Sequence, residues 1–240
     1  MSQATLIADS GTTKVSRDEL RMVPAPEGTR TFKPIPHAEV VDALVEALGF
    51  RHIGVVRDEY AVSTDGMKMF GVLDLETAFN GCRFAIGVRN ANDRSMRFSI
   101  TTGYRVFVCS NLAFQGEFTP VLAKHSKNFS IPDSLAIGVD RIQRNFEPLR
   151  QQVEHWQLEQ ITDEQAKLVI YRAFIQGDLR VPRALARDVH RNYFEPTHQD
   201  FAPRTMWSLS NAFTSALKSL DPIPLFQATA KLGMFFQFNS

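Results

Sequence analysis

The stretch CRFAIGVRNANDRSMRFSITTGYRVFVCSN, residues 82–111, decides the fold. Its first and last parts alternate large apolar side chains with polar or small ones, which is typical of strands that bury one face. Between them lies the segment NANDRS, residues 90–95, which is rich in turn-forming residues. The stretch therefore predicts a long antiparallel hairpin whose apolar face is covered by another layer.

Two more strands are expected before this hairpin. The predicted strands lie near residues 51–62, 67–76, 82–90 and 96–109, with turn signals at Thr64-Asp-Gly66 and Asn80-Gly81. Short connections join antiparallel neighbours, so the four strands form a meander. Before them, apolar residues recur at helical spacing and end at the C-cap candidate Gly49, namely Val40, Val41, Leu44, Val45 and Leu48.

The chain divides into three predicted parts. Residues 1–33 are an N-terminal arm with a short helix at the Ser16–Glu19 capping box. Residues 34–132 hold the helix and the β-meander core. Residues 133–240 form a helical part packed on that core. The fold class is α+β: a helix-led antiparallel β-meander of about four strands, followed by a helical C-terminal part.

The C-terminal part contains several expected helices. A long helix is interrupted or kinked near Pro148, and a second begins at the Thr162–Gln165 capping box. Two more cover Arg183–Tyr193 and Thr205–Leu220. The last stretch, DPIPLFQATAKLGMFFQFNS, is apolar and broken by prolines, so we expect it to dock on the body or on a neighbouring subunit. Its FFQF segment resembles an interface, which favours a homo-oligomer.

Composition narrows the function classes. The hydrophobic content of 44% and charged content of 22% are ordinary for a soluble globular protein, and a net charge of +1 favours neither nucleic acid nor membrane. No apolar run approaches a membrane span, and the N-terminus lacks the apolar core of a secretory signal. A cytoplasmic protein without membrane contact is expected. In that compartment Cys82 and Cys109, at the open end of one hairpin, are expected to be free thiols.

No motif announces catalysis or a cofactor. The sequence lacks GxxxxGK[ST], GxGxxG, HExxH, GxSxG and CxxC, and its acidic residues are scattered. No Cys or His lies at ligand spacing from either cysteine. We therefore assign no catalytic residue, no metal site and no cofactor.

Basic residues cluster on the hairpin. The candidate nucleic-acid contacts there are Arg83, Arg89, Arg94, Arg97 and Arg105, and a mid-chain loop adds Lys124 and Lys127. Strand alternation places arginines and hydroxyls on one sheet face and apolar residues on the other. Such a face can follow a phosphate backbone. The alternative is a solvated face whose arginines pair with acidic residues such as Asp58, Glu59, Asp74 and Glu76.

Two further sets have competing interpretations. Asn90, Asn92, Asp93, Ser95 and Asn111 are candidates for a ligand site, although Asn and Asp also dominate turns for local reasons, and turn chemistry is favoured. Four phenylalanines near the hairpin suit base stacking or, more commonly, a core, namely Phe107, Phe114, Phe118 and Phe129.

Several short motifs together resemble a known family. They are Asp18-Glu-Leu, Pro34-Ile-Pro-His37, Gly87-Val-Arg-Asn90, Asp93-x-Ser95, Gly103-Tyr-x-Val-Phe-Val-Cys-Ser-Asn111 and Trp207-Ser-Leu-Ser-Asn-Ala-Phe-Thr214. Over residues 16–220 the chain resembles domain of unknown function 932, a family borne by phages and plasmids, in which a helix-led β-meander carries such a turn and strand end. Arg94 stands where the family most often has Gly. The resemblance implies a mobile-element context and no established activity.

Three functional hypotheses follow. The first is a non-enzymatic nucleic-acid-binding protein that binds or anneals single strands; the order of elements is also similar to that of single-strand annealing proteins, an analogy only. The second is a module that inhibits or modulates a host defence factor by binding it. The third is a hydrolase with a site at the Asn90–Asp93 turn and His125.

Overall fold

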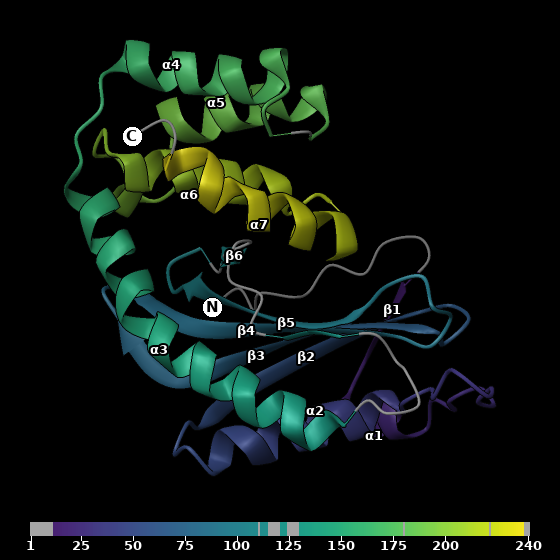
Figure 1. Cartoon of the computed structure of the whole chain (residues 1–240). Coiled ribbons are helices and arrows are strands. Elements are labelled where there is room, and N and C mark those ends of the chain that lie inside the picture. The colour runs from purple at the N-terminus through teal and green to yellow at the C-terminus, as the bar shows by residue number, and fades with distance from the viewer. Residues whose placement is uncertain are drawn as a thin grey trace.

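The centre of the protein is an antiparallel sheet. The structure is a computed structural model, and it describes residues 12–109, 111–114, 121–123, 130–179, 181–220 and 222–237. In these residues the strands follow the order β1-β2-β3-β4-β5-β6, and β7 also pairs with β5 (Figure 1). Their bounds are β1 (Thr12–Val15), β2 (Val55–Ser63), β3 (Lys68–Phe79), β4 (Cys82–Ala91), β5 (Phe98–Val106), β6 (Leu112–Phe114) and β7 (Val121–Ala123).

The predicted α+β class and meander are confirmed. Strands β2 to β5 are the four expected ones, and helix α2 (His37–Gly49) precedes them. Between β3 and β4, Asn80 and Gly81 both have positive φ, 40° and 74°, as a tight hairpin turn with the twist of the strands requires. The sheet is larger than expected, because β1 lies within the predicted arm and pairs with β2, and because β6 and β7 pair with β5.

Helices lie on both sides of the sheet (Figure 1). Their bounds are α1 (Arg17–Arg21), α2, α3 (Ile131–Leu158), α4 (Asp163–Tyr171) with a π-helical turn (Arg172–Gln176), α5 (Ala186–Phe194), α6 (Met206–Leu217) and α7 (Pro222–Gln237), with 3-10 turns at Arg183–Leu185 and Gln199–Phe201. In Figure 1, α1 and α2 lie below the sheet, and α6 and α7 lie above it. None of the helices in the described ranges is long and apolar enough to cross a membrane.

Local signals explain where several helices begin. Both predicted capping boxes are present, at Ser16 for α1 and at Thr162 for α4. Helix α3 continues through Pro148, so of the two expected outcomes, an interruption or a kink, the interruption is wrong.

The C-terminal segment was expected to be broken by its prolines, and this is also wrong. Pro222 and Pro224 lie in the first turn of α7. A missing N–H has no cost at that position, since the first turn has no intrahelical acceptors. Phe235 and Phe236 of α7 are buried, and Phe236 contacts the rings of Trp156 and Phe213. They belong to the core of the chain instead of to an exposed interface.

Candidate nucleic-acid interface

The sheet face that was expected to expose arginines is buried. The β4–β5 register pairs Arg83 with Arg105 and Arg89 with Ser99, so these residues share a face as predicted. However, Ser99 and Arg105 are buried. A second apolar cluster lies on that face, made of Ala61, Phe70, Val72, Ala85, Leu112 and Phe114. Its small residues leave room for Phe114 of β6 to reach the ring of Phe70, with centroids 6.1 Å apart.

Arg105 belongs to a buried ion-pair network on this face. Its Nε lies 2.9 Å from the carboxylate of Asp74 on β3, and its Nη2 lies 3.2 Å from Glu59 on β2. Glu59 also accepts from Lys14 of β1 at 3.1 Å and from Arg57 at 2.8 Å. The network joins four strands. For Arg105, therefore, the alternative of pairing with Glu59 and Asp74 is the one that the geometry favours.

The other predicted basic residues have different surroundings. Arg83 is half-buried, donates to the carbonyl of Leu75 at 3.2 Å and lies over the ring of Phe107. Arg89 is half-buried, and burial lowers the pKa of its guanidinium. Arg94 and Arg97 are exposed on the β4–β5 turn. Lys124 and Lys127, like His125, lie outside the described residues.

Arg94 meets a loop that sequence reasoning did not consider. Its Nη2 donates to Thr29 Oγ1 at 3.1 Å, and its guanidinium carbon lies 4.6 Å from the ring centroid of Phe32. Arg30 and Lys33 of the same loop are exposed. We call Arg30, Phe32, Lys33, Arg94 and Arg97 the basic tip. In the described part of the chain, Arg30, Lys33 and Arg97 take part in no ion pair.

Arg94 also has an uncommon backbone. Its φ is 65°, in the left-handed region that favours glycine. Glycine, the residue that the family resemblance led us to expect at this turn position, adopts this conformation without strain. A non-glycine residue there bears some strain, which the contacts of its side chain with Thr29 and Phe32 help to offset.

Asn90 and Asn92 attach this loop to the hairpin. Asn92 accepts from the N–H of Ile35 at 3.0 Å, and both asparagines donate to the Ile35 carbonyl, at 3.0 and 2.9 Å. Asn90 Nδ2 also lies 2.9 Å from Nδ1 of His37, whose Nε2 lies 3.0 Å from the Gly66 carbonyl. Because a carbonyl only accepts, Nε2 carries the proton and Nδ1 accepts from Asn90. Burial lowers the pKa of His37.

The remaining turn residues act locally. Asp93 accepts from the Ser95 N–H at 2.9 Å and forms an ion pair with Lys68 at 3.2 Å. The N–H of Asn92 donates to the carbonyl of Met67. For Asp93 and Ser95 the local bond is the turn chemistry that competed with a ligand site, whereas the side chains of Asn90 and Asn92 bond to a distant segment.

Asn111 connects two motifs of the family resemblance that lie 100 residues apart in sequence. Its Nδ2 donates to the carbonyl and to Oδ1 of Asn211 on α6, both at 3.1 Å. Nearby, Lys218 donates to the carbonyl of Cys109. Both cysteines are free, and burial raises the pKa of the Cys82 thiol to about 12 and also raises that of Cys109. Neither thiol is therefore a ready nucleophile at neutral pH.

A separate groove lies at the edge of the sheet, where α1 leaves β1. It has a volume of about 670 Å³. One wall is formed by residues 14–17 and Glu19, and the other by residues 57–60 of β2. No motif in the sequence predicted this groove. Its walls come from two segments that only the β1–β2 pairing brings together.

Comparison with curated proteins and with solved structures finds no match to the chain. A family model described as Domain of unknown function (DUF932) matches residues 28–223. These residues include the basic tip, the Asn90–His37 contacts and the Asn111–Asn211 pair. Since the match covers most of the chain, the protein belongs to the family described as Domain of unknown function (DUF932).

Proposed function

We propose that the protein binds nucleic acid through the basic tip, without catalysis, and that single strands are its preferred ligand. The observation that carries this proposal is the exposed group Arg30, Lys33, Arg94 and Arg97, in which the guanidinium of Arg94 lies over the ring of Phe32. These cations come from two segments that lie far apart in sequence and meet at one end of the hairpin. The proposal moves the contact from the sheet face, which is buried, to this tip.

The chemistry of the tip suits a phosphodiester chain with unpaired bases. Guanidinium groups donate paired hydrogen bonds to phosphate oxygens. A guanidinium that lies over an aromatic ring also offers a flat surface on which a base can stack, and duplex DNA does not expose its base faces. The competing interpretation is that Arg94 and Phe32 form only a solvated cation–π pair at the surface. Such a pair contributes about 0.5–1 kcal/mol to stability and binds no ligand.

The anchoring of the loop supports binding as well. The bonds from Asn90 and Asn92 to Ile35 hold the loop against the hairpin before any ligand arrives. A site that is already ordered loses less conformational entropy on binding. Four cations can therefore act together although the net charge of the whole chain is only +1.

The test is a fluorescence-anisotropy titration with a labelled single strand and its duplex at several salt concentrations. The double variant Arg94→Gln/Arg97→Gln should bind the single strand more weakly whatever its sequence. The slope of log affinity against log salt should become shallower by about 1.4, because two phosphate contacts contribute about 0.7 each for single strands.

The matched control is Arg183→Gln/Arg187→Gln, which removes two exposed arginines from the C-terminal part. It should bind like the wild type. The proposal fails if the wild type does not bind even at low salt, or if the tip and control variants weaken binding equally.

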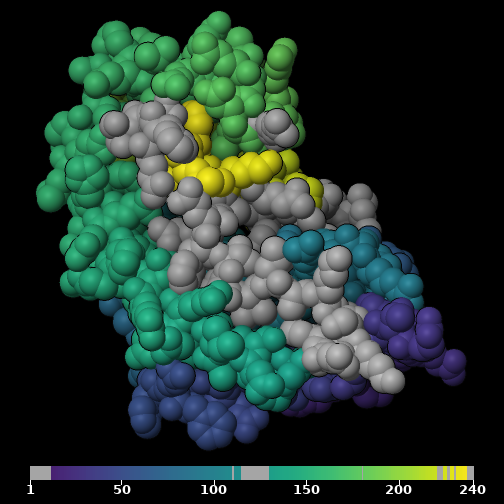
Figure 2. Space-filling view, viewed as in Figure 1, coloured from purple at the N-terminus to yellow at the C-terminus, as the bar shows by residue number. Residues whose placement is uncertain are grey.

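A second candidate function is binding to a host protein, the role suggested for a modulator of a defence factor. Leu168, Tyr171 and Ile175 are 56%, 50% and 49% exposed and follow one another at i, i+3 and i+7 on α4 and its π-helical turn. Helix α4 lies at the outer end of the molecule (Figure 2), where a partner can reach it. Exposed apolar stripes of this kind are typical of helix-recognition surfaces.

This second function predicts a partner that stays bound at high salt. Leu168→Gln/Ile175→Gln should release it, while the control Leu158→Gln, at another exposed leucine, should not. Retention of the partner by the stripe variant would contradict this function. The mobile-element origin and the homo-oligomer remain predictions.

A further inference from the structure

The loop side of the basic tip is held by a contact that depends on the protonation of His37. Nε2 of His37 donates to the Gly66 carbonyl at 3.0 Å, and Nδ1 accepts from Asn90 Nδ2 at 2.9 Å. The same Nδ2 also donates to the carbonyl of Ile35 at 3.0 Å. Ile35 closely follows residues 29–33, the loop that carries the tip. One amide group of Asn90 therefore joins the imidazole ring to the loop.

A proton on Nδ1 is incompatible with this arrangement. Nε2 is a donor in both forms of the ring, so its bond to Gly66 persists and keeps Nδ1 aimed at Asn90. Protonated Nδ1 is a donor as well, and it meets Nδ2, which only donates. The amide can turn over, because Asn90 Oδ1 is buried and accepts no hydrogen bond from the described part of the chain. An oxygen then faces the Ile35 carbonyl, so either response breaks the bond from Asn90 to Ile35.

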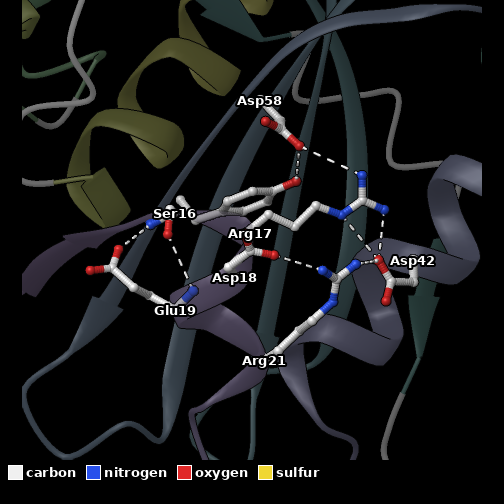
Figure 3. Close-up of polar contacts among 8 residues, drawn as sticks. Ser16, Arg17, Asp18, Glu19, Arg21, Asp42 and Asp58 are labelled. Atoms are coloured by element: carbon white, nitrogen blue, oxygen red, sulfur yellow. Dashed lines mark hydrogen bonds and ion pairs between the residues drawn. The ribbon is translucent and has the colours of Figure 1, made fainter.

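Helix α2 is fixed and does not yield in place of the loop (Figure 3). Arg17 of α1 donates to Asp42 of α2 at 3.0 and 2.6 Å, and Arg21 also reaches Asp42. Arg17 lies 3.9 Å from Asp58 of β2, so these contacts tie α2 to the sheet as well. Four apolar side chains of α2 are fully buried in the core, namely Val40, Val41, Leu44 and Leu48. The segment before His37 is therefore the part that moves.

We infer that His37 and Asn90 form a pH-sensitive switch that orders the loop side of the basic tip and weakens nucleic-acid binding when His37 is protonated. The inference rests on the proposed binding at the tip. With a neutral ring, the loop is ordered before the ligand arrives. With a protonated ring, the two bonds from Asn92 remain, and a smaller fraction of the chain presents both sides of the tip together.

The surroundings of the ring set the pH at which the switch acts. Burial lowers the pKa of His37, whereas the bond to the Gly66 carbonyl raises it. The ring also lies in the first turn of α2, a helix of 13 residues, and the positive end of a helix disfavours a further cation. The switch therefore acts below the ordinary histidine pKa of about 6.5.

Two carboxylates lie beside the residues that contact the ring. A bond from Ser63 holds the pKa of Asp65 below its ordinary value. Burial raises the pKa of Asp93, but its bonds with Ser95 outweigh burial, so the pKa is lowered. A response that begins near neutral pH therefore does not arise from either group. The charged groups on the elements around the ring are Lys33, Glu39, Asp42, Asp65, Lys68, Arg89 and Asp93.

The competing explanation is that the two bonds from Asn92 hold the loop by themselves. Protonation of His37 would then lower the stability of the whole chain and leave the order of the tip unchanged. A switch predicts instead a local response in the loop before global unfolding, so the two explanations are separable.

The first measurement is an NMR titration of the full chain without nucleic acid. The ring nitrogen shifts of His37 give its midpoint, and the side-chain N–H resonances of Asn90 should move with the same midpoint. The N–H groups of Thr29 and Phe32 donate hydrogen bonds within the loop. Their protection from hydrogen exchange should decrease about threefold or more as His37 is protonated, while that of Leu44 in the middle of α2 should change less.

The second measurement is an anisotropy titration with labelled oligothymidine, whose bases do not titrate in this range. The affinity of the wild type should decrease about threefold or more between about pH 7.5 and the His37 midpoint. Protonation of exposed histidines alone would strengthen binding to a polyanion, so the sign is diagnostic. His37→Gln should show no decrease, because glutamine does not titrate. The control His155→Gln, at a histidine whose side chain is 70% exposed, should behave like the wild type.

The two measurements separate the switch from the proposed function. The switch is overturned if the Asn90 resonances or the protection of the loop do not follow the His37 titration. It is also overturned if the wild type and His37→Gln bind oligothymidine with the same pH profile. If the wild type does not bind at about pH 7.5, the proposed function fails, while the NMR titration still decides whether His37 controls the order of the loop.

Discussion

The hydroxyl of Thr102 is a buried polar group without a partner among the described residues. Thr102 is fully buried on β5 opposite Ile86, and its Oγ1 has no hydrogen bond to that part of the chain. An unsatisfied buried hydroxyl costs about 1–3 kcal/mol, and valine has nearly the same shape without that group. We expect Thr102→Val to raise the free energy of unfolding by about 1 kcal/mol in urea titrations. The exposed control Thr13→Val should change it by less than about 0.5 kcal/mol, and a destabilised Thr102→Val would contradict the prediction.

His37 makes stability depend on pH near neutrality. Its folded pKa lies below the usual value of about 6.5 because the ring is buried against Gly66 and Asn90. Below about pH 6.5 the unfolded chain therefore binds more protons at this residue than the folded chain does. The stabilisation from the neutral ring is complete above that pH and decreases as the pH falls toward the folded pKa.

The measurement for His37 is the free energy of unfolding between about pH 7.5 and 5.5, a window above the titration of most carboxylates. The wild type should lose stability as the pH falls. His37→Gln should be less stable at the upper end and should show a smaller slope. Equal slopes for the two proteins would show that another group titrates.

At the scale of elements, β5 and β6 approach unusually closely. A Cβ atom on Gly103 would overlap the carbonyl oxygen of Ala113 and lie 2.9 Å from Cα of Phe114. Because these are backbone atoms of a neighbouring strand, they cannot move aside without breaking the pairing. We expect Gly103→Ala to reduce the free energy of unfolding by about 3 kcal/mol. The control Gly49→Ala, with no atom within 4 Å of the new Cβ, should be neutral or slightly stabilising. An unchanged free energy of unfolding for Gly103→Ala would mean that β6 does not pair closely with β5 at this position.

Periodicity predicted the elements that are long enough to show it. Helix α2 and strands β2 to β5 span between 9 and 13 residues, and their apolar patterns were clear. Strands β1, β6 and β7 have only three or four residues, too few for alternation to be recognised. In α7 the prolines were taken as breakers although their position in the first turn makes them compatible with a helix.

For the whole molecule, the main difference from expectation is that both faces of the sheet are buried. Alternation identifies which residues share a face, and it did so correctly for Arg83 and Arg105. It does not reveal whether a face is covered, because the C-terminal helices lie far along the chain and β6 is too short to show a pattern. The partners of Arg105 depend in addition on the β2–β3 and β3–β4 registers, both of which contain shifts that no sequence pattern reveals. The Thr29–Lys33 side of the basic tip was missed for the same reason, since only the fold brings it to Arg94.

The buried network around Arg105 should matter to the stability of the whole sheet. Arg105, Glu59 and Asp74 have side chains 10%, 4% and 5% exposed and come from three strands. Without the guanidinium, two buried carboxylates lose an ion-pair partner in a place where water solvates them poorly. Breaking a buried ion pair in this way typically lowers the free energy of unfolding by about 3–5 kcal/mol. We expect Arg105→Gln to reduce the free energy of unfolding by about 3 kcal/mol, measured by urea titration at neutral pH.

The control for Arg105 is a pair of the same kind at the surface. Arg51, in the turn after α2, and Asp140 of α3 also join two segments, at 2.9 Å, but their side chains are 39% and 37% exposed. Water and salt screen such a pair, so Arg51→Gln should cost less than about 1 kcal/mol. The double variant Arg105→Gln/Glu59→Gln should recover part of the loss if unpaired charge is the cause, because it removes one of the carboxylates. Equal effects of Arg105→Gln and Arg51→Gln would show that the network adds little to the stability of the sheet.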